Sequence, residues 1–461
     1  SAHRARHIGR ALDHPMISRR SLWQGACSAG ILAWPGGARA LGRTPMSGKL
    51  KLALPWPVTS LDPHDPFDPT AALFAHAVFD QLYALDAAGE PFPTLATDLP
   101  TAEGGKTLVR LREGLLTAKG RKLEARDVIF SLQRARRGGA NAWWGDLPAP
   151  TPHAKDPLAV LFSTSDAARI AKTLSSPLFA LVPRGFDPSS PDGTGAMTPQ
   201  ISLARMLLKR NANAARGASF LEEIAIDQAT DLSASLRSFE GNLTDIGWLG
   251  AGLHAPRPGA LAFDLGSVAW IVLQTGNEAG SWGAPGLAQR LLDGLAPERL
   301  QHFGLGPLPA PSGSAEWGGK PCELLIQEGS AYLDELGRAV SSLLSRPGHE
   351  VSVKGVPGAE LIRRRAAGTY SLALGVVRPF AGPGIATLVA LAAASDPSSA
   401  LELMRSPPRL STLSPRALTR TLRLGVLGEL RVVGAHAPDV RLAKSMAGEG
   451  WDLGATYRAP A

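Results

Sequence analysis

Residues that could carry out chemistry are present in this sequence, but they do not form a known catalytic motif. His349-Glu350 lacks the second histidine that an H-E-x-x-H zinc site needs. The sequence contains no G-x-S-x-G nucleophile elbow, no G-x-x-x-x-G-K-[ST] phosphate loop and no complete G-x-G-x-x-G fingerprint. We therefore expect no enzymatic activity, and a secreted enzyme is the less favoured alternative.

Two histidines stand close to acidic residues in the first quarter of the chain. His64 and His76 occur near four aspartates, Asp62, Asp65, Asp68 and Asp80. A metal site is one interpretation of this group. We favour turn residues and a surface helix, because zinc sites usually show more closely paired ligands. No metal and no cofactor is therefore expected.

The segment from Ser60 to Arg137 predicts the elements that would position such residues. An Asp-Pro turn leads into an amphipathic helix over Leu73–Leu82, and a hairpin with a glycine at its tip follows over residues 83–90. Asp127 can cap the start of a second amphipathic helix, because an acidic side chain is favourable at that end. The segment thus predicts a turn, a helix, a hairpin and a second helix, in that order.

This order of elements resembles the N-terminal third of the peptide- and oligopeptide-type solute-binding proteins of ABC importers. About eight motifs of that family follow in sequence between residues 48 and 250, each weak alone and specific together. They include Pro93–Ala96, the D-V-x-F-S-L-x-R pattern at 127–134, Gly193-Thr194-Gly195, Leu207–Asn211 and Leu236–Ile246. The resemblance thins after Ala255.

The resemblance implies an α/β protein with the two-lobed periplasmic-binding-protein fold of the class II type, with an extra subdomain inserted in the first lobe. The first lobe would take residues 48–64, 186–258 and 437–461, the inserted subdomain 65–185, and the second lobe 259–436. Alternating strands and helices after residue 320 fit a second α/β lobe.

In this fold the ligand lies between the lobes, so the resemblance also implies candidate ligand-binding residues. Trp56, Trp248 and Trp270 are near strand ends that would face the cleft, and binding clefts are mostly apolar with a few polar groups. For each tryptophan alone, core packing is the favoured role. Gln274 ends a strand at which the family usually has asparagine.

The segment 375–383 departs from the family. Peptide binders often carry an aspartate there that pairs with the α-amine of the peptide, whereas this chain has Arg378 followed by Phe380. A buried Arg378 would suit a carboxylate, a phosphate or another anion through bidentate hydrogen bonds. The alternative is an exposed, solvated arginine.

The first forty residues look like a leader. Ser18–Leu22 resembles a twin-arginine export signal, an apolar run follows to Trp34, and Ala38-Arg39-Ala40 fits the small-x-small cleavage rule. An ordinary apolar helix is the alternative. Residues 1–40 hold six arginines and one aspartate, so only +3 of the net charge of +8 belongs to the rest of the chain. That charge is too weak to indicate a nucleic-acid partner.

These observations predict an exported, periplasmic solute-binding protein that uses the twin-arginine or the general secretory route. It would capture a small ligand, peptide-like or another organic solute, by Venus-flytrap closure of two lobes. It would then deliver the ligand to an ABC permease in the inner membrane, and a monomer is expected. The alternative is a non-transport sensor or chaperone-like binding module with the same fold.

Overall fold

A computed structural model describes residues 46–248, 257–306, 308, 310–312, 316–382, 384–405, 413–446 and 450–459. The expected leader, residues 1–40, lies outside these ranges. Among the described residues, no helix is both long enough and apolar enough to span a bilayer.

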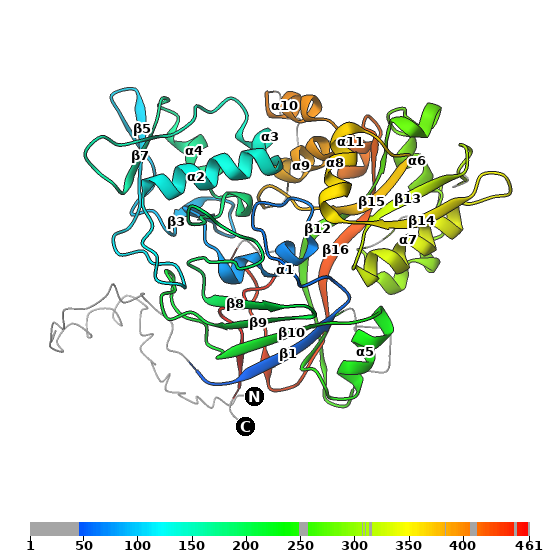
Figure 1. Ribbon diagram of the computed structural model, residues 1–461, viewed down its shortest axis with the longest axis horizontal. Helices are drawn as coiled ribbons and strands as arrows, with labels where there is room; N and C mark the ends of the chain where they lie inside the picture. The colour runs from blue at the N-terminus through cyan, green and yellow to red at the C-terminus, as the bar shows by residue number, and fades with distance from the viewer. Residues whose placement is uncertain are drawn as a thin grey trace, which may run out of the picture. The chain divides into compact units, whose positions relative to one another are not determined.

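A ten-stranded mixed sheet runs through the described chain (Figure 1). Its strand order is β14-β13-β15-β12-β16-β11-β1-β10-β9-β8. The strands are β1 (Lys49–Leu54), β8 (Met197–Ser202), β9 (Arg205–Arg210), β10 (Glu223–Gln228), β11 (Ile246–Trp248), β12 (Leu261–Thr275), β13 (Cys322–Gln327), β14 (Val351–Val356), β15 (Leu372–Val377) and β16 (Leu424–His436). The mixed α/β composition agrees with the predicted fold class.

Strand β1 shows how local sequence forms this sheet. Leu50, Leu52 and Leu54 alternate with less apolar residues and are fully buried, as the period of a strand requires. The strand pairs in parallel with β10, with Leu52 opposite Ile226. The predicted first strand, Gly48–Leu54, is confirmed.

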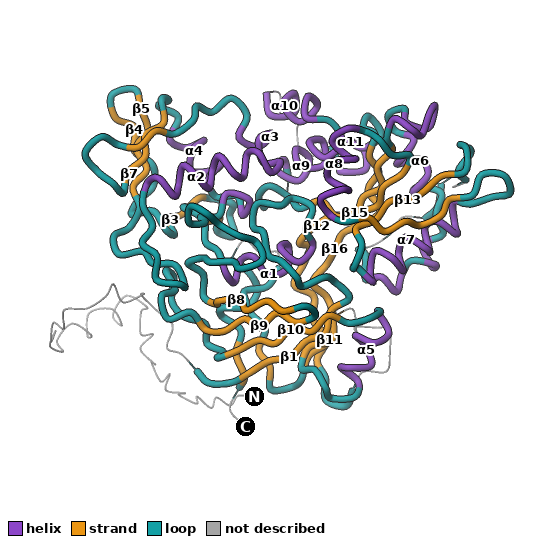
Figure 2. The backbone as a smooth tube through the Cα atoms, in the orientation of Figure 1, coloured by secondary structure: helices purple, strands orange, loops and turns teal. Residues whose placement is uncertain are grey.

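Strands β12 and β16 join the two ends of the large sheet. They pair with each other in antiparallel fashion, while β12 also contacts β15 and β16 also contacts β11. Their register shifts between Asp264 and Ala269, where bulges bend and twist a strand. Figure 2 shows both strands extending along the sheet. The sheet is therefore expected to bend at residues 264–269.

Three smaller sheets accompany the large one. Residues 83–93 form the predicted hairpin, and Gly89 at its tip has a φ of 81°, a backbone conformation that favours glycine. The strands of the smaller sheets are β2 (Tyr83–Leu85) with β3 (Pro91–Pro93), β4 (Thr101–Glu103), β5 (Lys106–Arg110), β6 (Thr151–Pro152) and β7 (Ala159–Phe162), and β17 (Val440–Arg441) with β18 (Tyr457–Arg458).

The helices pack around these sheets (Figure 1). They are α1 (Pro69–Val78), α2 (Ala125–Ala135), α3 (Asn141–Trp144), α4 (Ala167–Leu174), α5 (Leu232–Glu240), α6 (Leu287–Asp293), α7 (Ala331–Leu344), α8 (Gly358–Ala367), α9 (Ile385–Ser395), α10 (Pro397–Arg405) and α11 (Pro415–Thr419). Helix α1 begins four residues before the predicted Leu73, because the Asp68 side chain accepts a hydrogen bond from the Thr70 N–H and Pro69 occupies the first turn.

Two large hydrophobic clusters lie within the described residues. The first follows the sheet and contains strands β1 and β10 together with helix α7. The second combines residues 82–181 with residues from 377 to 426, including the apolar helix α9. The ring of Trp143 stacks on that of Phe380, with centroids 6.1 Å apart. The residue bounds of the two lobes and of the inserted subdomain stay a prediction.

Candidate binding pocket

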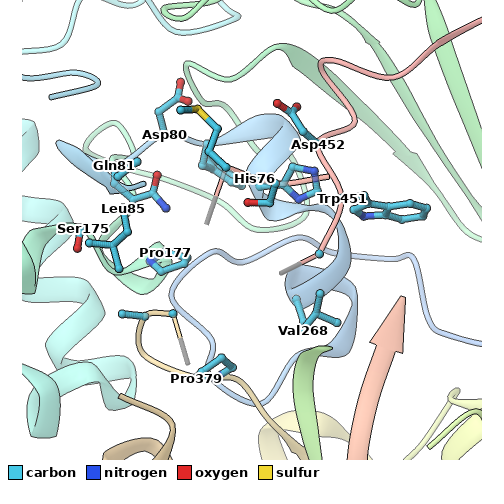
Figure 3. Close-up of a pocket in the computed structure, with 18 of the residues that line it drawn as sticks. His76, Asp80, Gln81, Leu85, Ser175, Pro177, Val268, Pro379, Trp451 and Asp452 are labelled. Carbon is cyan, nitrogen blue, oxygen red and sulfur yellow. The ribbon is translucent and has the colours of Figure 1, made fainter. Parts of the chain in front are cut away.

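A cavity among the described residues has a volume of about 220 Å³. Segments far apart in sequence line it: α1 and the residues after it, Arg216-Gly217, Ser267-Val268 in β12, part of 378–382, and part of the segment 445–452 (Figure 3). Ligand pockets typically form where separate segments converge, and drug-sized ligands occupy about 300–1,000 Å³. This cavity therefore suits a smaller molecule.

Apolar side chains form much of the cavity wall. Phe79, Leu85, Phe92, Val268 and Trp451 all line it. The indole N–H of Trp451 donates to the Leu73 carbonyl oxygen at 2.7 Å, which holds the C-terminal segment against α1. The wall can thus contact the apolar body of a solute at a fixed position.

Asp80 and Arg216 provide the principal ion pair on the wall. Asp80 is 3% exposed, and its Oδ2 accepts a hydrogen bond from the Thr194 hydroxyl at 2.9 Å. Its Oδ1 lies 3.5 Å from Nη1 of Arg216, whose side chain is 35% exposed. Burial lowers the pKa of the neighbouring Arg112, and the charge of Arg216 lowers it further while Asp80 opposes both.

The Gly193-Thr194-Gly195 motif places Thr194 against Asp80. A Cβ atom at Gly193 would overlap the Val78 carbonyl oxygen, and one at Gly195 would lie 2.6 Å from the Ala77 carbonyl oxygen. The Gly195 N–H donates to Val78 at 2.9 Å. Only glycine permits this close approach to the end of α1, so the motif has a structural reason here.

His76 and Asp452 lie next to each other on the wall (Figure 3). Nε2 of His76 accepts a hydrogen bond from the Leu453 N–H at 3.2 Å. Burial lowers the pKa of His76 to about 4, against the opposing charge of Asp452 and with the help of Arg216. His76 is therefore neutral at physiological pH.

Arg378 is the one predicted ligand-binding residue that lines this cavity. It is buried, at 5% exposure, so the first of the two interpretations of its environment holds. Its Nη1 donates to the carbonyl oxygens of Pro63 at 3.1 Å and Asp65 at 2.8 Å, and its backbone N–H donates to Pro66. Arg378 thus braces the Asp-Pro turn.

The turn's aspartates face arginines from three other segments. Arg134 of α2 forms two hydrogen bonds to Asp62, at 2.7 and 2.6 Å. Burial lowers the pKa of Arg378, while Asp68, Asp65 and Asp62 oppose that change. Asp65 acts in the same opposing direction on Arg365. Arg378 therefore interacts mainly with the acids and the carbonyl oxygens of the Asp-Pro turn.

Burial also shifts the pKa values of Asp68 and His64 in the Asp-Pro turn. Burial raises the pKa of Asp68 to about 7, and the nearby charge of Asp65 adds to this effect. His64 contacts the Ala180 carbonyl oxygen through Nε2 at 2.8 Å and Nη1 of Arg134 through Nδ1 at 3.0 Å. Burial lowers the pKa of His64 to about 4. His64 and His76 therefore contact different segments.

Trp56 and Trp248, two further predicted residues, lie in the first hydrophobic cluster and do not line the cavity. Their ring centroids are 5.7 Å apart, and Trp56 also packs on Tyr332 at 4.5 Å. Both indoles are essentially fully buried. Their direct role in ligand binding stays a prediction, and in this structure they form core.

The remaining predicted residues lie elsewhere. Trp270 is half-buried against the second hydrophobic cluster, and Phe380 contacts Trp143. Gln274 lines a smaller cavity of about 170 Å³ together with Arg365 and Arg423, and its Nε2 donates to Ala394 at 2.6 Å. The structure thus does not bring the six predicted residues together.

Sequence reasoning did not select Asp80, Thr194 or Arg216 as site residues. Thr194 lies within the family motif Gly193-Thr194-Gly195, and Arg216 follows the motif Leu207–Asn211 by five residues. The two glycines of Gly193-Thr194-Gly195 were the available signal, because they let the backbone approach α1 closely and so fix the position of Thr194. Which acid that side chain would contact depends on tertiary structure.

Comparison with known proteins supports the fold. Neither a family model nor a curated protein sequence matches this chain. The pheromone receptor PrgZ, solved for its mode of peptide binding, has a TM-score of 0.68 and 14% identity, covering 91% of this chain and 100% of PrgZ. AppA, the oligopeptide-binding protein from Bacillus subtilis in complex with a nonapeptide, has a TM-score of 0.67 and 13% identity, with coverages of 91% and 100%.

A third structure with this fold holds a ligand of another kind. AgaA from A. tumefaciens R10, in complex with agropinic acid, has a TM-score of 0.63 and 14% identity, covering 90% of this chain and 99% of AgaA. The chain therefore has the two-lobed periplasmic-binding-protein fold of the peptide- and oligopeptide-type solute-binding proteins, as the resemblance of residues 48–250 predicted.

Proposed function

We propose that this protein is an exported solute-binding protein that captures a small organic solute in the cavity beside Asp80 and Arg216. The observation that carries the proposal is the cavity itself. It lies where α1, β12, the segment 378–382 and the C-terminal segment converge, in a fold shared along nearly its whole length with binding proteins. The cavity combines apolar walls with a few oriented polar groups, as ligand sites do.

Delivery completes the proposed role. The protein acts in the periplasm as a monomer, closes on its solute, and presents the closed form to an ABC permease in the inner membrane. Strands β12 and β16 are the proposed hinge, because they cross between the two ends of the sheet and their pairing shifts register near Asp264–Ala269. The protein belongs, in this proposal, to the peptide-binding family and is not an enzyme.

A thermal-shift screen against small peptides, organic acids and neutral metabolites tests the proposal. At least one solute should raise the melting temperature of the wild type, because a ligand that binds only the folded state stabilises it. The variant Ala72→Trp places a large ring at the cavity wall and should lose that response.

The matched control is Ala168→Trp on the exposed side of α4, which should respond as the wild type does. The proposal fails if no solute shifts the wild type, or if Ala72→Trp responds as strongly as the control.

A further inference from the structure

Two arginines share a single aspartate at the cavity. Asp80 has Arg216 at 3.5 Å, and its charge also acts on Arg112. Within the described part of the chain, this 3.5 Å contact is the one ion pair that either arginine makes. Nε of Arg112 is buried without a hydrogen-bond partner there. Asp80 thus interacts with two arginines, and Asp452 is a second acid on the same cavity wall.

Arg216 is the arginine of this group that reaches the cavity. It lines the wall, and its side chain is 35% exposed, whereas Arg112 does not line the cavity and donates through Nη2 to the Ala215 carbonyl oxygen at 2.7 Å. Asp80 is buried with both oxygens already accepting, from Thr194 and Arg216. Because a guanidinium has five N–H donors, Arg216 keeps donors for another acceptor.

The other charged groups on the wall have different partners. Arg378 faces the acids of the Asp-Pro turn and donates to the carbonyl oxygens of Pro63 and Asp65. Asp452 acts on His76, and its Oδ1 accepts from the Ala455 N–H at 3.1 Å. Arg216 is therefore the arginine on the wall whose remaining N–H donors are not already directed at the Asp-Pro turn.

We propose that Arg216 determines specificity by pairing with the carboxylate of a small organic anion. The apolar body of that anion contacts Phe79, Phe92 and Trp451, which line the same cavity. A planar carboxylate fits the donor fork of a guanidinium through bidentate hydrogen bonds. This inference rests on the proposed function, because it names the class of solute that the same cavity takes.

Calorimetric titration with matched acid and amide probes tests the inference. Phenylacetate and butanoate are compared with phenylacetamide and butanamide, which have similar shapes but no charge. The wild type should bind each acid at least about 10-fold more tightly than its amide, because hydrogen bonds to charged groups are the strong ones. Arg216→Gln should reduce that ratio to near one, and Arg216→Lys should retain part of it.

The exposed Arg237 of α5 supplies the control. Its side chain is 67% exposed and lies 3.8 Å from Asp231, so Arg237→Gln should preserve the acid-to-amide ratio. Circular dichroism establishes that each variant is folded, and if Arg216→Gln does not fold, a reduced acid-to-amide ratio in Arg216→Lys decides the matter.

Three outcomes would overturn the inference. In the first, acids and amides bind the wild type equally. In the second, the wild type binds neither probe class while other neutral or cationic solutes raise its melting temperature, so that the proposed function stands and Arg216 does not select anions. In the third, no solute of any class binds, and both proposals fail together.

Discussion

At the scale of single residues, burial and partner geometry decide what each charged side chain can do. Arg378 was predicted to contact a ligand anion, and it is buried at the cavity as required. Its guanidinium also holds the carbonyl oxygens of Pro63 and Asp65. Arg216 was not predicted, although it reaches the cavity with donors to spare. The sequence therefore indicated that an arginine could bind an anion, but only the tertiary structure shows which arginine has free donors at the cavity.

The ion pair of Asp62 with Arg134 should stabilise the fold in a pH-dependent way. Burial acts to raise the pKa of Asp62, but the hydrogen bond and charge of Arg134 outweigh it, so the pKa is lowered. That stabilisation is present above the unfolded-state pKa of about 4 and is lost as the pH falls through the lower folded-state value. Asp62→Asn should therefore lower the free energy of unfolding by about 1–3 kcal/mol at pH 7.

Urea unfolding at pH 7 and at pH 3 measures this difference, with Glu103→Gln on an exposed strand as the control. The difference between wild type and Asp62→Asn should shrink at pH 3. An equal difference at both pH values would contradict the role of the carboxylate charge.

The close approach of Gly193 to α1 gives a second prediction at this scale. Gly193→Ala would bring a Cβ into the Val78 carbonyl oxygen and within 2.6 Å of the Phe79 ring. Overpacking of this kind costs about 1–3 kcal/mol, and the shift should also displace Thr194 from Asp80. The melting temperature is expected to fall, together with solute binding.

Gly358→Ala is the matched control, because a Cβ there would lie 3.5 Å from Gln327 at the start of α8. It should leave the melting temperature unchanged or raise it slightly. Equal stability of the two alanine variants would show that the close contact between Gly193 and the end of α1 does not require glycine.

At the scale of elements, the local sequence predicted those strands and helices that local interactions stabilise. Strand β1 and the hairpin β2–β3 follow from alternation and from a glycine turn. Helix α2 follows from the acid in its first turn, because the Asp127 side chain accepts from the Glu124 N–H. Helix α9 was not predicted from its alanine-rich sequence, because it is buried nearly all round and shows no amphipathic stripe.

Asp127, in the first turn of α2, should contribute measurably to stability. Asp127 is buried and accepts from the Glu124 N–H through Oδ2 and from the Arg184 N–H through Oδ1, each at 3.0 Å. Asp127→Ala would leave these donors without their acceptor, which costs about 1–3 kcal/mol. Chemical denaturation should show this loss, while Arg126→Ala on the exposed face of the same helix should stay within about 0.5 kcal/mol of wild type. Similar losses in both variants would exclude a specific capping role.

At the scale of the whole molecule, the order of motifs predicted the fold, while the position of the cavity required the tertiary structure. Trp56 and Trp248 were expected at cleft-facing strand ends, and they pack with Tyr332 in the core. No local pattern distinguishes these two environments, since a strand end can face either one. The cavity joins Ser267, Arg378 and Trp451 from distant parts of the chain, and their proximity follows only from long-range packing.

A crystal structure of the protein grown with a solute that passes the thermal-shift screen tests the central claim most directly. The account predicts electron density for that solute in the cavity lined by Phe79, Arg216 and Trp451, with the solute enclosed between the segments that converge there. Density for the solute only on an outer surface, with this cavity empty, would contradict it.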